Sequence, residues 1–171
     1  LKFVVIMHSH FDHLVDINVY NDFNIPVYAH ESIKDYGENI KVDFKIDKHL
    51  KDEEKIFLKN SESSKKVIEM EVMHTPGHRF DCICLLIGES NGKRSIFTSD
   101  TLFVGGCGRV DFSGSDKSLM FETLQKLKQL PNDVVVYPGH DYGKTKTSTI
   151  GTEKINNPYL KMDKETFLSL R

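Results

Sequence analysis

The stretch His8-Ser9-His10-Phe11-Asp12-His13 places three imidazoles and a carboxylate within six residues, directly after an apolar run. If that run is a strand, alternate side chains point to opposite faces, so His8 and His10 leave its end on the same side. Asp12 and His13 fall in the following turn and can fold back toward the same point. Neutral ring nitrogens together with a carboxylate suit a divalent ion such as zinc, manganese or iron. The stretch therefore predicts a metal site, because a polar loop with incidental histidines does not account for such a density of ligand-type side chains.

The composition is that of a globular protein. The chain has 171 residues, enough for one domain spanning 1–171 with a sizeable core, and its 39% hydrophobic and 28% charged residues are ordinary values. The 23 basic and 25 acidic residues leave a formal net charge of −2, which counts against a nucleic-acid partner because such proteins usually carry a basic excess. No apolar run reaches membrane-spanning length, so no membrane partner is expected, and no signal-peptide pattern opens the chain. Since Leu1 falls in the middle of a predicted strand, we expect the domain to be incomplete at its N-terminus.

The three cysteines, Cys82, Cys84 and Cys107, are too few for a disulfide framework. They indicate a reducing compartment, and we expect a cytoplasmic location, with an organellar one left open. Cys82 and Cys84 lie two residues apart in an apolar segment and would share one face of a strand. A two-thiolate zinc site and a pair of small buried hydrophobic side chains both fit that spacing, and the second interpretation is favoured.

Hydrophobic periodicity predicts alternating strands and helices in a single α/β chain, with no repeat and no domain boundary. Strands are expected over 3–7, 25–29, 67–73, 82–87, 95–98 and 134–137. Helices are expected over 14–23, over 116–130, from 153 to a break at Pro158, and finally over 163–170. The charged stretch 41–66 is expected to form solvated strand edges and turns. The isolated His30 and His49 are expected to be surface or capping residues.

A ligand-type residue follows the end of a predicted strand four times along the chain. Pro-Gly precedes two of these residues and makes the tight turn that aims the next side chain, and in α/β folds such strand ends meet at one site. The candidate ligands are His8, His10, Asp12, His13, His78, Asp100 and His140. Seven exceed the four ligands of one tetrahedral zinc, and they fit two adjacent metals sharing a carboxylate, a type of site that catalyses hydrolysis.

In order and spacing these motifs resemble those of the metallo-β-lactamase superfamily. The matching segments are 8–13, Thr75-Pro76-Gly77-His78, 98–103 and Tyr137-Pro138-Gly139-His140. The glycine-rich segment 105–109 and the tail 148–160 look like the glyoxalase II (hydroxyacylglutathione hydrolase) branch and its close relatives, the persulfide dioxygenases. The resemblance implies an αβ/βα four-layer sandwich in which only the last of the strands that usually precede the first histidine motif remains.

The resemblance also implies a division of the ligands. His8, His10 and His78 would hold one metal, Asp12, His13 and His140 the other, and Asp100 would bridge the two. His74, the other histidine beside Pro76-Gly77, would either position the metal ligands without binding the metal itself or have a purely structural role.

The chain departs from the pattern of the family in several places. Arg79-Phe80-Asp81 replaces the usual Thr or Ser and glycine after the third ligand histidine, and Ser99 stands where glycine is usual before the bridging carboxylate. The helical extension that binds glutathione in typical glyoxalase II enzymes is absent from the 171 residues. Transfer of the glutathione substrate therefore stays open.

The resemblance implies a metallo-hydrolase that splits a thioester such as S-acylglutathione with a metal-activated hydroxide. It would use two divalent ions, zinc first and iron or manganese as alternatives, with Asp12 and Asp100 as catalytic residues. Arg109 would either contact an anionic substrate or brace its loop, and Tyr142 would be a second substrate contact.

Three alternatives remain from the sequence. The first is a persulfide dioxygenase with one Fe(II) held by His8, His78 and Asp100. A nuclease and a non-catalytic metal-binding module rank below it, the nuclease because no basic stripe with aromatics is seen.

Overall fold

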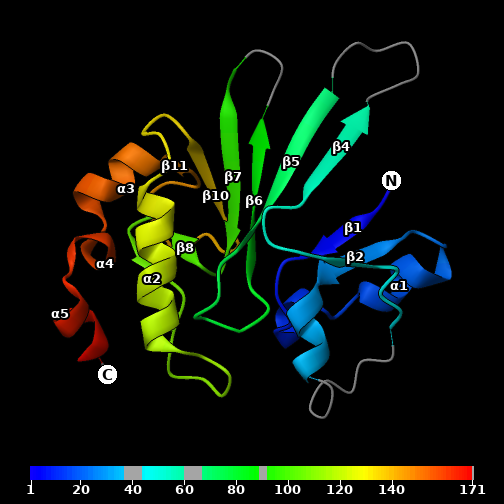
Figure 1. The fold of residues 1–171 in the computed structure, drawn as a ribbon, viewed down its shortest axis with the longest axis horizontal. Helices are drawn as coiled ribbons and strands as arrows, with labels where there is room; N and C mark the ends of the chain where they lie inside the picture. Colours follow the sequence, from blue (N-terminus) through cyan, green and yellow to red (C-terminus); the bar gives the residue numbers. More distant parts are fainter. Residues whose placement is uncertain (37–43, 60–66, 89–91, 171) are drawn as a thin grey trace.

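The chain folds into two β-sheets with helices on their outer faces (Figure 1). The structure, a computed structural model, describes residues 1–36, 44–59, 67–88 and 92–170. Three separate clusters of buried apolar side chains lie between successive layers, one under each set of helices and one between the sheets. Three apolar interfaces define four layers, because each layer must bury one face against the next. The chain therefore has the predicted αβ/βα sandwich.

The first sheet is small and parallel, in the order β1 (Val4–Ile6), β2 (Val27–His30), β3 (Lys48–Leu50). The 3-10 turns η1 (Phe11–His13) and η2 (Glu31–Tyr36) and the helix α1 (Ile17–Asp22) accompany it. Its outer core consists of Ile6, Leu14, Ile17, Val27, Ala29 and Ile33. The helix expected from residue 14 begins later, because η1 first turns the chain through the metal-ligand motif.

The second sheet has six strands in the order β11-β10-β7-β6-β5-β4. Its strands are β4 (Lys55–Lys59), β5 (Val67–His74), β6 (Ile83–Gly88), β7 (Arg94–Ser99), β10 (Val135–Pro138) and β11 (Ser148–Thr149). The neighbours from β4 to β7 are antiparallel, whereas β10 lies parallel to β7. A two-stranded ribbon of β8 (Leu102–Phe103) and β9 (Gly106–Cys107) follows β7. Of the charged stretch 41–66, the described part holds β3 and β4, and the remainder lies outside the described residues.

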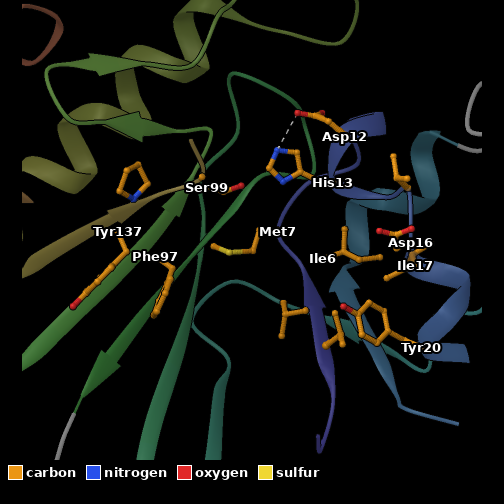
Figure 2. A pocket seen from close by; sticks show the side chains of 15 residues that line it. Ile6, Met7, Asp12, His13, Asp16, Ile17, Tyr20, Phe97, Ser99 and Tyr137 are labelled. Carbon is orange, nitrogen blue, oxygen red and sulfur yellow. Dashed lines mark ion pairs between the residues drawn. The ribbon is translucent and has the colours of Figure 1, made fainter. Parts of the chain in front are cut away.

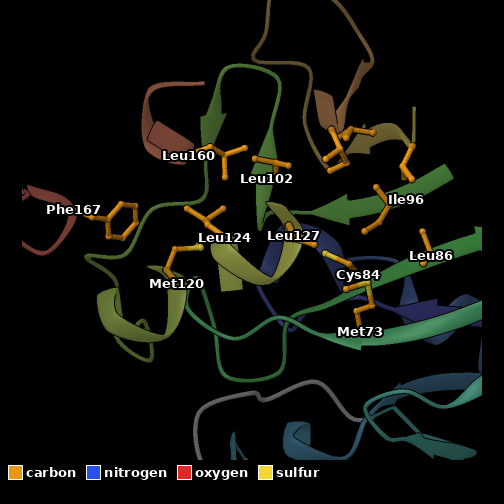
Figure 3. Close-up of a cluster of buried hydrophobic side chains, with 13 residues drawn as sticks. Met73, Cys84, Leu86, Ile96, Leu102, Met120, Leu124, Leu127, Leu160 and Phe167 are labelled. Atoms are coloured by element: carbon orange, nitrogen blue, oxygen red, sulfur yellow. The ribbon is translucent and has the colours of Figure 1, made fainter. Parts of the chain in front are cut away.

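Helices of the second half cover the outer face of the large sheet (Figure 1). They are α2 (Lys117–Lys128), α3 (Ile150–Asn156), α4 (Pro158–Lys161) and α5 (Lys164–Leu168). The carboxylate of Asp116 caps α2 by accepting the N–H of Leu119 at 2.9 Å. As Figure 3 shows, Met120, Leu124 and Leu127 of α2 lie among residues of the sheet and of α4 and α5. Met120, Leu124 and Leu127 form the buried apolar stripe of α2, and Leu119 lies off this stripe because the residue is 38% exposed.

The core between the sheets contains Leu50, Ile56, Met70, Val72, Ile83 and Leu85. The N–H of Ile83 donates to the carbonyl of Met7 at 2.9 Å, and this hydrogen bond connects the start of β6 to the segment that leads into His8. Cys82 and Cys84 are free and fully buried, as the favoured interpretation predicted. No helix within the described residues has the length and apolar character needed to cross a membrane.

Candidate metal centre

The seven predicted ligands converge where strands from both sheets end. His8, His10, Asp12 and His13 follow β1, with the last two in η1. His78, Asp100 and His140 follow β5, β7 and β10 of the large sheet. Strand ends that meet at one edge bring residues far apart in sequence into a single cluster.

The ligand atoms fall into three overlapping groups, within each of which they lie within 4.8 Å of one another. The groups are His8, His10 and His78; His8, His13 and Asp100; and Asp12, His13 and His140. Nδ1 of His10 lies 2.8 Å from Nε2 of His78. Asp100 lies between the outer groups, with Oδ2 at 3.7 Å from Nε2 of His78 and at 3.3 Å from Nε2 of His140.

The donor atoms fit divalent cations. Nδ1 of His78 donates to the carbonyl of Arg109 at 2.7 Å, so its Nε2 presents a lone pair to the cluster. Nδ1 of His8 lies 3.0 Å from Oγ of Ser99. Within the part of the chain that the structure describes, Nε2 of His8 and Oδ1 of Asp100 are buried without a hydrogen-bond partner. Buried polar atoms left without partners are costly, and a cation at this point would satisfy them.

Burial sets the protonation of the site. It lowers the pKa of His8 far below the usual range, helped by the neighbouring His13, and it lowers the pKa of His10 to about 4. The pKa of His78 is also lowered, first by burial. Burial raises the pKa of Asp100, against the opposing effect of His13. The imidazole rings of His8 and His10 are therefore neutral at neutral pH, so each ring has one nitrogen with a free lone pair that can bind a metal.

Close backbone contacts hold Asp100 in place. A Cβ atom on Gly108 would lie 1.9 Å from the carbonyl oxygen of Asp100, so only glycine fits there. Ser99 adopts φ of 45°, a left-handed conformation that favours glycine, which gives a physical reason for the glycine usual at this position. In this chain the Ser99 hydroxyl contacts His8, a role that the sequence signalled only as a departure from the family pattern.

A pocket of about 560 Å³ opens beside the ligand cluster. Arg109 and Tyr142, the two predicted substrate contacts, both line it. The guanidinium of Arg109 forms two hydrogen bonds with Asp111, at 2.9 and 2.6 Å, and lies 4.2 Å from the centre of the Phe112 ring. Tyr142 stacks on His140 with ring centroids 5.0 Å apart. Arg109 thus has an acidic partner within its own loop, as the loop-bracing alternative requires.

The glycine-rich loop is held from behind by Glu153 and Asn157, two buried residues that the sequence did not single out. The N–H of Gly105 donates to Oε2 of Glu153 at 2.8 Å. Nδ2 of Asn157 donates to the carbonyl of Gly106 at 2.9 Å and to Oε2 of Glu153 at 2.9 Å. Isolated polar residues in a helical tail carry no sequence signal of such a role, because their partners lie about 50 positions earlier in the chain.

His74, Arg79 and Asp81 make structural contacts of their own near the ligand cluster. His74 lies outside the three ligand groups: its ring stacks on His30, with centroids 4.0 Å apart, and its Nε2 donates to the carbonyl of Phe80 at 2.7 Å. Arg79 and Asp81, which replace the usual small residues, are both buried and form an ion pair with Nε 3.6 Å from Oδ1. Pairing lowers the cost of burying the two charges.

A second groove, of about 390 Å³, lies between the two sheets, and His13 is one of the residues that line it (Figure 2). Ile6, Ile17 and Tyr20 form one wall, and Phe97 and Tyr137 form the other. Asp12 lines both this groove and the pocket beside the ligands. Apart from Asp12 and His13, the predicted ligands do not line it, so the larger pocket is the one that faces the cluster.

The sequence of this chain places it in a family. Residues 1–140 match the family described as the Metallo-beta-lactamase superfamily, and the chain belongs to it. The predicted resemblance is therefore confirmed at the level of the superfamily, and its relatives include both hydroxyacylglutathione hydrolases and persulfide dioxygenases.

Three relatives illustrate the range of proteins to which this chain is similar. The chain is 34% identical over 172 residues to the probable polyketide biosynthesis zinc-dependent hydrolase PksB of Bacillus subtilis (strain 168), covering 98% of this chain and 68% of PksB. It is 32% identical over 142 residues to the hydroxyacylglutathione hydrolase of Francisella tularensis subsp. novicida (strain U112), covering 83% of this chain and 50% of that protein. The crystal structure of ETHE1 from Myxococcus xanthus superimposes with a TM-score of 0.74 at 27% identity, covering all of this chain and 71% of that one. ETHE1 is also the name of the mammalian persulfide dioxygenases among the relatives, of which the chain spans 39%.

Proposed function

We propose that this chain is a metallo-hydrolase of the glyoxalase II-like group that splits a thioester such as S-acylglutathione into a carboxylic acid and a thiol. The observation that carries the proposal is the convergence of seven nitrogen and oxygen donors in overlapping groups, with Asp100 in reach of both outer groups. Two ions sharing a carboxylate are the arrangement that such a donor set favours.

In this proposal His8, His10 and His78 would hold one ion, Asp12, His13 and His140 would hold the other, and Asp100 would contribute to both sites. Zinc is the first choice, and iron or manganese suit the same donors. When bound, the ions supply Lewis acidity, which makes water nucleophilic at neutral pH and polarises the thioester carbonyl.

The side chains of this chain supply the remaining steps. Asp12, whose side chain is 56% exposed, lies in the pocket beside the ligands and is placed to orient the attacking water. Cleavage of the C–S bond releases a thiolate, which is a stable leaving group, so no strong protein acid is required. Tyr142 lines the pocket that receives the substrate.

The test combines metal content with thiol release. The protein, including any native segment beyond these residues, is expected to hold two equivalents of metal per chain and to release thiol from S-lactoylglutathione or another S-acyl thioester. Full metal loading without thiol release from any thioester would contradict the proposal.

The second candidate function is persulfide dioxygenase activity, supported by the buried subset His8, His78 and Asp100 and by the ETHE1 relatives. These three side chains would hold one Fe(II) as a facial triad with open positions. Oxygen uptake with glutathione persulfide, together with one equivalent of iron, would favour this function over the hydrolase.

A cytoplasmic, reducing location is part of the same proposal. It rests on the free state of Cys82, Cys84 and Cys107. A small-molecule substrate is the expected partner, and a nucleic acid is not.

A further inference from the structure

Four aromatic side chains form the walls of the pocket beside the metal ligands. Phe11 comes from η1, Phe103 from β8, and Phe112 and Tyr142 from loops that follow β9 and β10. Phe11 is 78% exposed and Tyr142 is 71% exposed, although large apolar rings are usually buried. Exposed rings gathered around one cavity indicate a site where apolar surface is buried when a ligand binds.

Ring contacts fix most of these walls before a ligand arrives. Tyr142 lies parallel to His140, with an interplanar angle of 12°, and Phe103 meets Tyr142 edge-on with centroids 5.2 Å apart. Phe112 meets His10 edge-on at 5.6 Å. Because neighbouring rings hold Phe103, Phe112 and Tyr142 in place, binding a flat group in the pocket costs little conformational entropy.

The charges of the pocket are already paired. Among the described residues that line it, Arg109 is the one lysine or arginine, and its guanidinium pairs with Asp111 and lies against the ring of Phe112. Asp12 and Asp100 face the histidine cluster. A carboxylate on the acyl chain of a substrate would therefore share Arg109 with the carboxylate of Asp111, and it would lie near the like charges of Asp12 and Asp100, which disfavours it.

We propose that this pocket selects thioesters with a flat, apolar acyl group, such as an aromatic acyl group, and disfavours acyl groups that carry a carboxylate. The inference rests on the proposed thioester hydrolysis and assigns the acyl side of its substrate. The volume of about 560 Å³ falls in the range of ligand pockets and accommodates a ring beside the reacting carbonyl.

The experiment uses three thioesters of one small neutral thiol, N-acetylcysteamine, so that only the acyl group changes. The acetyl, benzoyl and succinyl thioesters are compared by kcat/KM on metal-loaded protein. The benzoyl thioester is expected to exceed the acetyl thioester by about tenfold or more, and the succinyl thioester to fall below both. Equal values, or a preference for succinyl, would overturn the inference.

Variants locate the selectivity. Phe11→Ala and Tyr142→Ala are each expected to reduce the ratio of benzoyl to acetyl kcat/KM several-fold, and Phe11→Leu, which keeps apolar bulk, is expected to retain most of it. Phe23→Ala is the matched control, because Phe23 is 73% exposed and lies outside the residues that line the pocket. If Phe23→Ala lowers the ratio as much as Phe11→Ala does, the selectivity does not arise from the pocket and the inference fails.

Binding measurements separate this inference from the proposed function. The thioether analogues S-benzyl- and S-carboxymethyl-N-acetylcysteamine cannot be hydrolysed, and calorimetry compares their affinities directly. Tighter binding of the benzyl compound, lost in Phe11→Ala, supports the inference even if no thioester is turned over, a result that would contradict only the hydrolase. Hydrolysis without any preference in rate or affinity would support the hydrolase and overturn the inference.

Discussion

Gly139 and Asp100 are in such close contact that a Cβ atom on residue 139 would lie 2.4 Å from Oδ1 of Asp100. Gly139→Ala is therefore expected to push the carboxylate out of the cluster and to lower metal affinity by about 10- to 100-fold. Titration of the metal-free protein with zinc measures the change. Gly88→Ala is the control, because a Cβ there meets nothing within 4 Å. Unchanged zinc affinity in Gly139→Ala would show that Asp100 is not a ligand.

Removal of a ligand side chain should change metal stoichiometry in steps. His78→Ala is expected to lose the ion held with His8 and His10, leaving about one ion per chain, and Asp100→Ala is expected to lower occupancy at both positions. Plasma mass spectrometry on dialysed protein gives the count. Asp133→Ala, which removes an exposed carboxylate outside the three ligand groups, serves as the control. Two retained equivalents in His78→Ala would contradict the ligand assignment.

The apolar stripe of α2 allows a stability prediction within one helix. Leu124 is fully buried, so Leu124→Ala is expected to lower the free energy of unfolding by about 2–5 kcal/mol. Leu119→Ala removes the same atoms from a partly exposed position, and the expected loss is below about 1 kcal/mol. Urea denaturation of the two variants at one pH measures the difference. Equal losses would contradict the position of α2 against the sheet.

The His30 ring gives a pH dependence with a definite sign. Burial, and next the neighbouring His74, lower its pKa to about 4 from an ordinary 6.5, so between these values the unfolded chain binds a proton that the folded chain does not. The free energy of unfolding should therefore fall as the pH drops from about 6.5 toward 4, and stay independent of this group above 6.5. Urea denaturation of metal-free protein at pH 7.5 and pH 5 is expected to show a smaller loss for His30→Asn than for the unsubstituted chain. The other histidines are common to both proteins. An identical loss in both would show that His30 is freely protonated in the fold.

The sequence predicted the architecture well because strand ends and ligand motifs coincide. The apolar runs before His8, His78, Asp100 and His140 all became strands of one or the other sheet. The start of α1 was predicted too early because residues 14–16 form a turn between η1 and the helix, and a short apolar spacing does not distinguish a turn from the start of a helix.

Properties that depend on tertiary packing could not be predicted from the sequence. His30, expected as a surface or capping residue, does accept the N–H of Ser32 but is only 5% exposed, because His74 from another strand covers its ring. The pairing of Arg109 with Asp111 was not predicted either, because residue types alone do not show which nearby carboxylate an exposed arginine contacts. Burial by distant segments and the choice among nearby charge partners are tertiary effects, and neither leaves a local pattern.

Because the first four ligands follow the small sheet and the other three follow the large one, bound ions would join the two sheets much as a disulfide joins distant segments of a chain. The resistance of this protein to unfolding would then vary with the free metal concentration, gaining RT ln(1 + [M]/Kd) for each site. Without the ions, the described strands β1 to β3 would still contact the large sheet through the apolar core between the sheets, the His30–His74 ring stack and backbone hydrogen bonds. Amide exchange in these strands would rise before exchange in β5 to β7, so the catalytic ions would also act as a latch between the two halves of the fold.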